Sequence, residues 1–187
     1  MIELRFYGVR IRVCFGFLFI NALMTLFSGN IAVLALCACL LHELGHMAVM
    51  KLFGQKIYSV TFYGAGVKIS PKKGTILTKW REAAVLCAGC GVNALLFMLF
   101  GCSPFGLINL FLCVFNMLPA GGLDGGRLLR LFLEESDKIS LRTAEYICRA
   151  AGCITAVLLP FAAYCADMRN ITVIIAAAFM LISALFR

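Results

Sequence analysis

The chain has two histidines, and they stand four residues apart in the run His42-Glu43-Leu44-Gly45-His46. Residues four apart share one face of a helix, so both imidazoles can bind the same metal ion. Glu43 follows His42 directly and can face the open coordination position, where a general base is needed. A catalytic zinc ion takes three protein ligands and keeps one position for water. We therefore predict a hydrolytic zinc centre with His42 and His46 as ligands and Glu43 as catalytic base.

The third ligand must be a carboxylate, because no third histidine exists. Asp124 is the first acidic residue after the long uncharged stretch 83–123. We predict that it completes the site and that each chain binds one Zn²⁺. The alternative interpretation of Asp124 is a turn residue, because Asp-Gly pairs are common in turns.

Composition places the chain in a membrane. Of its 187 residues, 63% are apolar and 14% are charged, against about half and about a quarter in globular proteins. An H-E-x-x-H run arises by chance in many soluble proteins. Ionisable groups inside an apolar span are costly, however, and such groups by default indicate a functional site. We therefore predict one intramembrane domain over residues 1–187.

The expected fold class is an all-α polytopic membrane protein with about six transmembrane helices and a small β-hairpin between helices 2 and 3. A spanning helix needs about 20 mostly apolar residues, and breaks in the uncharged stretches divide the chain. The predicted spans are 11–28, 31–53, 81–101, 104–118, 147–166 and 171–186. Residues 56–70 are rich in β-branched and aromatic residues around two glycines, which predicts the hairpin. Residues 128–133 are expected to form a short amphipathic helix.

The basic residues predict the orientation. The formal net charge is +8, and most Lys and Arg lie between apolar runs, where they mark the cytoplasmic side. If both termini are cytoplasmic, Arg169 is the only Lys or Arg that lies on the opposite side of the membrane. Spans two and four then both run inward and bring the histidines and Asp124 to a similar depth. We predict an integral protein of a bacterial cytoplasmic membrane whose active site opens to the cytoplasm. With no separate basic domain, no nucleic-acid partner is expected.

Ten cysteines lie almost entirely within apolar runs, where a thiol behaves as a small hydrophobic group. They therefore do not indicate a disulfide framework. Cys87 and Cys90 form a C-x-x-C pair within an uncharged helix, which favours a packing role over a redox or metal site.

The two motifs together resemble those of the site-2 protease family of intramembrane zinc metalloproteases. That family combines H-E-x-x-H with N-x-x-P-x-x-x-x-D-G, which Asn116, Pro119, Asp124 and Gly125 match. The resemblance covers about residues 10–187 and is greatest to the stage IV sporulation protein FB group, with its six spans and cytoplasmic-side motifs. It implies regulated intramembrane proteolysis, in which a peptide bond in or near a transmembrane segment of a membrane-associated substrate is hydrolysed. The resemblance is also compatible with a regulatory membrane partner.

The resemblance further suggests that Asn116 is catalytic and holds the substrate backbone or the developing oxyanion. The alternative for Asn116 is a capping or loop-bracing role. Relatives often have Ala-Gly-Pro where this chain has Ala88-Gly89-Cys90, before Asn93. We expect this difference to alter helix entry rather than chemistry. Neither a PDZ-like insert nor a nucleotide-sensing domain is expected.

Two other functions remain open at this point. A catalytically silent homologue would bind membrane proteins without cutting them, although every expected catalytic residue type is present. A metal transporter would place polar groups along a route and usually has repeated halves. Here the ionisable groups of the apolar spans form one cluster, which favours the enzyme.

Overall fold

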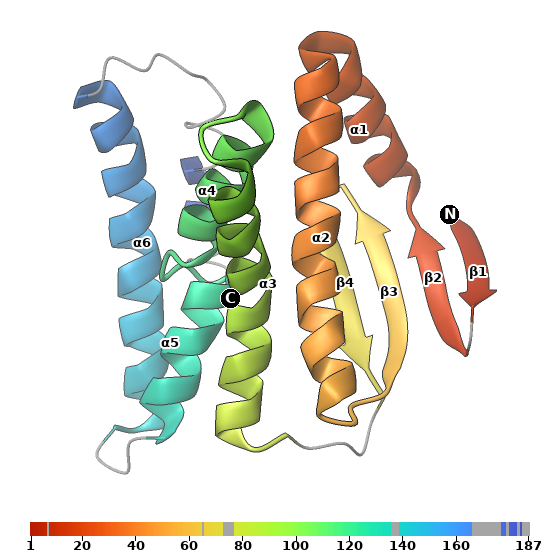
Figure 1. Ribbon diagram of the computed structural model, residues 1–187. Coiled ribbons are helices and arrows are strands. Elements are labelled where there is room, and N and C mark those ends of the chain that lie inside the picture. The colour runs from red at the N-terminus through yellow and green to blue at the C-terminus, as the bar shows by residue number, and fades with distance from the viewer. Residues whose placement is uncertain are drawn as a thin grey trace. The chain divides into compact units, whose positions relative to one another are not determined.

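The computed structural model describes most of the chain (Figure 1). The described residues are 1–6, 8–64, 66–72, 77–135, 139–165, 177, 178, 180–182 and 184. They fall into two compact units, Met1–Cys113 and Val114–Arg187.

Four helices dominate the first unit, and two glycines separate them. They are α1 (Phe15–Ser28), α2 (Asn30–Leu52), α3 (Lys79–Phe100) and α4 (Pro104–Asn116), the last of which continues into the second unit. Gly29 alone joins α1 to α2, and Gly101 ends α3. Both have a φ of 54°, in the left-handed region that glycine adopts without steric cost. These glycines allow the chain to reverse between apolar helices.

A four-stranded sheet accompanies these helices. Its strands are β1 (Ile2–Phe6), β2 (Val9–Val13), β3 (Ile57–Tyr63) and β4 (Gly66–Pro71). They lie in the order β1-β2-β3-β4. β1 and β2 form one antiparallel hairpin, β3 and β4 form another, and β2 pairs with β3 in parallel. Figure 1 shows the sheet next to α1 and α2.

The sheet confirms one prediction and corrects another. The hairpin expected at 56–70 is present as β3 and β4, but it is only half of the sheet. The first span was predicted from residue 11, which is wrong because residues 11–13 belong to β2. In β2, apolar residues alternate with Arg10 and Arg12, which is the period of a strand rather than of a spanning helix.

Among the described residues, three helices are long and apolar enough to cross a membrane: α2, α3 and α6 (Leu141–Cys165). At about 1.5 Å per residue they measure roughly 33–38 Å, more than the roughly 30 Å of a hydrocarbon core. The apolar helices α1 and α4 have 14 and 13 residues, or about 20 Å each. The part of the chain that the structure describes is therefore mostly helical with three candidate membrane helices, and the count of six spans is not confirmed.

Helices α2 and α3 pack closely within the first unit. A Cβ atom on Gly45 of α2 would lie 2.8 Å from the Val92 side chain and 2.9 Å from the carbonyl oxygen of Ala88. Both distances are shorter than normal carbon contacts, so the missing side chain lets the two backbones approach. This approach brings residues of α3 within hydrogen-bonding distance of side chains on α2.

In the second unit, α5 (Asp124–Glu135) and α6 lie against each other. The amphipathic helix predicted at 128–133 is confirmed as part of α5. The predicted fifth span, 147–166, corresponds to α6, which begins six residues earlier. Of the predicted sixth span, the described residues 177, 178, 180–182 and 184 are helical, and the others lie outside the described residues. Ala120, Ala156 and Met180 form a small buried core.

Candidate metal centre

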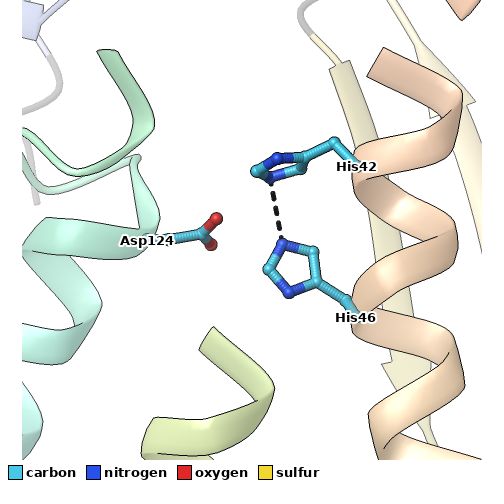
Figure 2. Close-up of side chains that lie close together, drawn as sticks. All are labelled: His42, His46 and Asp124. Atoms are coloured by element: carbon cyan, nitrogen blue, oxygen red, sulfur yellow. Dashed lines mark hydrogen bonds between the residues drawn. The ribbon is translucent and has the colours of Figure 1, made fainter. Parts of the chain in front are cut away.

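The two histidines lie side by side on α2 and are buried, with exposed fractions of 5% and 7%. Figure 2 shows both rings extending from the same side of the helix, as residues four apart should. The Nε2 atoms of His42 and His46 are 3.1 Å apart. What holds the rings in this position is found on α3.

The protonation of His46 follows from its partner. Its Nδ1 atom lies 2.7 Å from the backbone carbonyl oxygen of Val85. A carbonyl oxygen only accepts hydrogen bonds, so Nδ1 must carry the hydrogen and donate it. In the neutral ring this leaves the lone pair on Nε2.

The protonation of His42 follows from a longer chain of hydrogen bonds. The Asn109 side-chain amide donates to the carbonyl oxygen of Phe105 at 2.8 Å, so its oxygen must be the atom that accepts from Asn93 at 2.7 Å. The oxygen of Asn93 then faces Nδ1 of His42 at 2.5 Å, and Nδ1 must donate. Both asparagines are completely buried. One backbone carbonyl thus fixes the direction of every bond in the series.

Both histidines therefore present an Nε2 lone pair, and the two lone pairs face each other at 3.1 Å. Two lone pairs at that distance repel each other unless a cation or a proton lies between them. Zinc binds imidazole nitrogen at about 2.0–2.1 Å with tetrahedral geometry, which separates two ligand nitrogens by about 3.3 Å. The observed separation fits two ligands of one zinc ion.

Gly89 of α3 leaves space beside this pair. A Cβ atom there would lie 2.5 Å from Nε2 of His46 and 2.6 Å from Nε2 of His42. A methyl group there would therefore lie against both of the nitrogens that could bind a metal ion. The donor atoms, their protonation and the space beside them all suit a metal ion.

Asp124, the predicted third ligand, is the first residue of α5 in the second unit. Its exposed fraction is 8%, and Figure 2 labels its carboxylate at the start of that helix. The N-terminus of a helix carries a partial positive charge that favours a carboxylate. Gly125 and Gly126 follow. A Cβ atom on Gly125 would clash with the carbonyl oxygen of Met117, and one on Gly126 would clash with the carbonyl oxygen of Ala120. The glycines therefore allow this helix start to pack tightly against the preceding loop.

The remaining predicted residues occupy less buried positions. Glu43 is half-buried on α2, one residue after His42, and Asn116 is half-buried at the last residue of α4. The ten cysteines are all within the described residues and are all free thiols.

Four groups at the site were not predicted from the sequence: the side chains of Asn93 and Asn109, the space at Gly89 and the carbonyl of Val85. Asn93 and Asn109 carried a usable signal, because polar side chains within apolar helices need partners and often mark a site. The Val85 carbonyl carried none, because any residue supplies one.

The model of Peptidase family M50 matches residues 102–159. The chain is 30% identical over 146 residues to zinc metalloprotease Rip3 of Mycobacterium tuberculosis, covering 68% of this chain and 37% of that protein. It is 29% identical over 166 residues to stage IV sporulation protein FB of Bacillus subtilis, covering 77% of this chain and 57% of that protein. The chain thus spans from about a third to just over half of these relatives.

A solved structure is similar over nearly the whole chain. The site-2 protease from Methanocaldococcus jannaschii superposes with a TM-score of 0.68 at 24% sequence identity, covering 98% of this chain and 93% of that one. At this identity the likeness shows the fold. Together with the family match, it confirms the resemblance that the paired motifs indicated.

Proposed function

Because the motifs, the family match and the fold all agree with the site-2 proteases, we propose that this chain is an intramembrane zinc endopeptidase. It would hydrolyse a peptide bond in or near a transmembrane segment of a membrane-associated protein. The observation that carries the proposal is the pair of Nε2 atoms that face each other at 3.1 Å beside Gly89. Such a pair requires a cation or a proton between its lone pairs.

The proposed metal ligands are His42, His46 and Asp124. They supply two neutral imidazoles and one anionic carboxylate, which is a donor set that catalytic zinc sites use. When bound, Zn²⁺ lowers the pKa of a water molecule to about 7 and polarises the scissile carbonyl.

Two further side chains have proposed catalytic roles. Glu43 accepts the proton of the attacking water and later passes it to the leaving amine. Its position one residue after His42 keeps it next to the ligands on α2. Asn116 donates a hydrogen bond from its amide to the substrate backbone or to the oxyanion that develops on the attacked carbonyl.

The membrane arrangement is part of the proposal. Positive charge between the apolar helices favours cytoplasmic termini and a site that opens to the cytoplasm. Six membrane-inserted segments are proposed, of which α1 and α4 are short. A spanning substrate helix must unwind before cleavage, because its carbonyls are engaged in its own hydrogen bonds.

Strand β4 offers a place for the unwound segment. It pairs with β3 on one side and lies at an end of the sheet order, so an extended peptide can add to its outer side. Lys68→Pro and Ile69→Pro are tested together, because the N–H groups of neighbouring strand residues point to opposite sides. We expect one of these two variants to show sharply reduced cleavage. Leu4→Pro in the opposite edge strand β1 is the matched control. Full cleavage by both β4 variants would exclude strand addition.

Glu43→Gln tests the enzymatic proposal. The wild type and the variant are each co-expressed with a single-span membrane protein, fragments are sized, and bound zinc is measured by mass spectrometry. Loss of a general base should slow cleavage by about 10²–10⁴-fold while one zinc per chain is kept. Glu82→Gln, at the exposed start of α3, is the control.

The same experiment separates the alternatives. A silent homologue would bind the substrate equally well in both forms and cut it in neither. A transporter would make cellular metal uptake depend on the protein, with no fragments in either form. Either result would contradict the proposed protease.

A further inference from the structure

The second unit contains an open cavity of about 370 Å³ whose lining residues include none of the predicted metal ligands. We call it the basic cavity. It is lined by Arg127 and Arg130 of α5, by Glu145 and Arg149 of α6, and by the small residues Gly126 and Ala184, which leave it room. A smaller cavity of about 180 Å³ adjoins it and adds Arg142 to Glu145 and Arg149.

The charges of the basic cavity are unbalanced. Its walls carry three guanidinium groups and one carboxylate. Arg130 forms an ion pair with Glu134 at 2.6 Å. Within the part of the chain that the structure describes, no ion pair is recorded for Arg127, Arg142 or Arg149. These side chains therefore keep donors that an anionic ligand can use.

The basic cavity also lies at a particular level of a candidate membrane helix. Arg149 is the last charged residue of α6, and residues 150–165 are uncharged, a length of about 24 Å. Val157 and Phe161 in that stretch are 63% and 62% exposed, as expected of side chains that face lipid. Tyr146, which is 65% exposed at the charged end, is the residue type found at membrane surfaces. In a bilayer spanned by α6, this charged end would lie at the level of the lipid phosphates.

We propose that the basic cavity binds a phosphate group, carried by the headgroup of an anionic phospholipid or free in solution. Arginine presents a planar fork of donors that matches phosphate oxygens. The volume is within the range of about 300–1,000 Å³ typical of small-molecule sites. Basic pockets beside membrane helices at this depth suit anionic headgroups. An acidic peptide is disfavoured, because exposed apolar side chains follow Arg149 directly along α6.

Binding to the full chain in an uncharged detergent tests this proposal. Dioctanoyl phosphatidylglycerol, dioctanoyl phosphatidylcholine, inorganic phosphate and a polyglutamate peptide are each titrated by calorimetry. We expect phosphatidylglycerol to bind and the double variant Arg127→Gln/Arg149→Gln to bind it about 30-fold more weakly, at about fivefold per basic residue. Arg81→Gln, at the start of α3 in the other unit, should stay within twofold. The charge-preserving double variant Arg127→Lys/Arg149→Lys should retain most of the binding.

The ligand series separates the sources of phosphate. Displacement of the lipid by millimolar inorganic phosphate would support a soluble phosphate compound, and failure to displace it would support the lipid headgroup. Equal binding of phosphatidylcholine, unchanged affinity in a double variant with a normal unfolding temperature, or arginine-dependent binding of polyglutamate alone would each overturn the proposal. None of these measurements uses zinc or cleavage, so they are independent of the proposed protease.

Discussion

The region around α2 and α3 and the region around α5 and α6 both contain polar groups beside apolar helices. The two regions differ in how far these groups are buried and in how fully they are hydrogen-bonded. In the first, His42 of α2 and Asn93 of α3 are joined in one series of buried hydrogen bonds that continues through Asn109 and ends on a backbone carbonyl of α4. Between α5 and α6, arginines line an open cavity, and among the described residues only Arg130 of these arginines forms an ion pair.

Burial accounts for this difference. A buried polar group without a partner is costly, so a buried series must be complete and its direction becomes fixed. An exposed guanidinium is solvated and remains available to a ligand that comes and goes. The first region therefore suits a permanently bound ion, and the second suits an exchangeable anion. Substitutions that alter burial or pairing test this contrast.

Gly89→Ala should have the largest effect. The added methyl group would lie 2.5–2.6 Å from both Nε2 atoms, where it blocks the approach of a metal ion. We expect the variant to lose bound zinc and, with it, all cleavage. The helix itself should not suffer, because alanine is favoured over glycine in a helix by about 1 kcal/mol. Metal content after purification measures the result.

Gly91→Ala is the matched control for this change. Gly91 lies two residues further along α3, and a Cβ atom there would meet nothing within 4 Å. This variant should keep one zinc per chain. Equal zinc content in the two variants would mean that the space beside Gly89 is not where the ion binds.

Asn93→Leu should have the next largest effect. It removes the oxygen that accepts the hydrogen bond from Nδ1 of His42. The imidazole ring then has no fixed orientation, and its buried N–H donor is left unpaired. Loss of such a partner to a metal-binding histidine typically lowers metal affinity by about 10–100-fold. Asn93→Asp keeps an acceptor and should retain most of the affinity. Competition with a zinc chelator measures the zinc affinity of both variants. Equal zinc affinities for Asn93→Leu and Asn93→Asp would mean that Asn93 does not support the metal site.

Asn109→Ala should weaken zinc binding less, because it acts on His42 only through Asn93. Asn93 loses the acceptor of its amide but keeps the oxygen that faces His42. The expected costs are a few-fold in zinc affinity and about 1–3 kcal/mol in the free energy of unfolding. Once Asn93 is leucine, Asn109→Ala should change zinc affinity no further. Fully additive effects on affinity in this double-mutant cycle would contradict the proposed series.

The sequence predicted the parts of this molecule that depend on short-range spacing. The imidazole pair on α2 follows from four-residue spacing, and the hairpin at 56–70 follows from its composition. Strand β2 was missed because its apolar residues ran on into α1, which hid their alternation with Arg10 and Arg12. The carbonyl of Val85 and the space at Gly89 could not be predicted, because both depend on how closely α2 and α3 cross. Asp124 as a metal ligand remains a prediction from sequence.

Glu134→Gln should have the smallest effect, and it tests the other side of the contrast. Its hydrogen bond and its charge raise the pKa of Arg130, but the pair is exposed, so its loss should change the free energy of unfolding by less than about 1 kcal/mol. Arg130 would then contribute its full charge to the basic cavity, and phosphatidylglycerol should bind up to about fivefold more tightly. Zinc affinity should not change. Weaker lipid binding in this variant would mean that the ion pair, rather than the unbalanced charge of the arginines, shapes the cavity for its ligand.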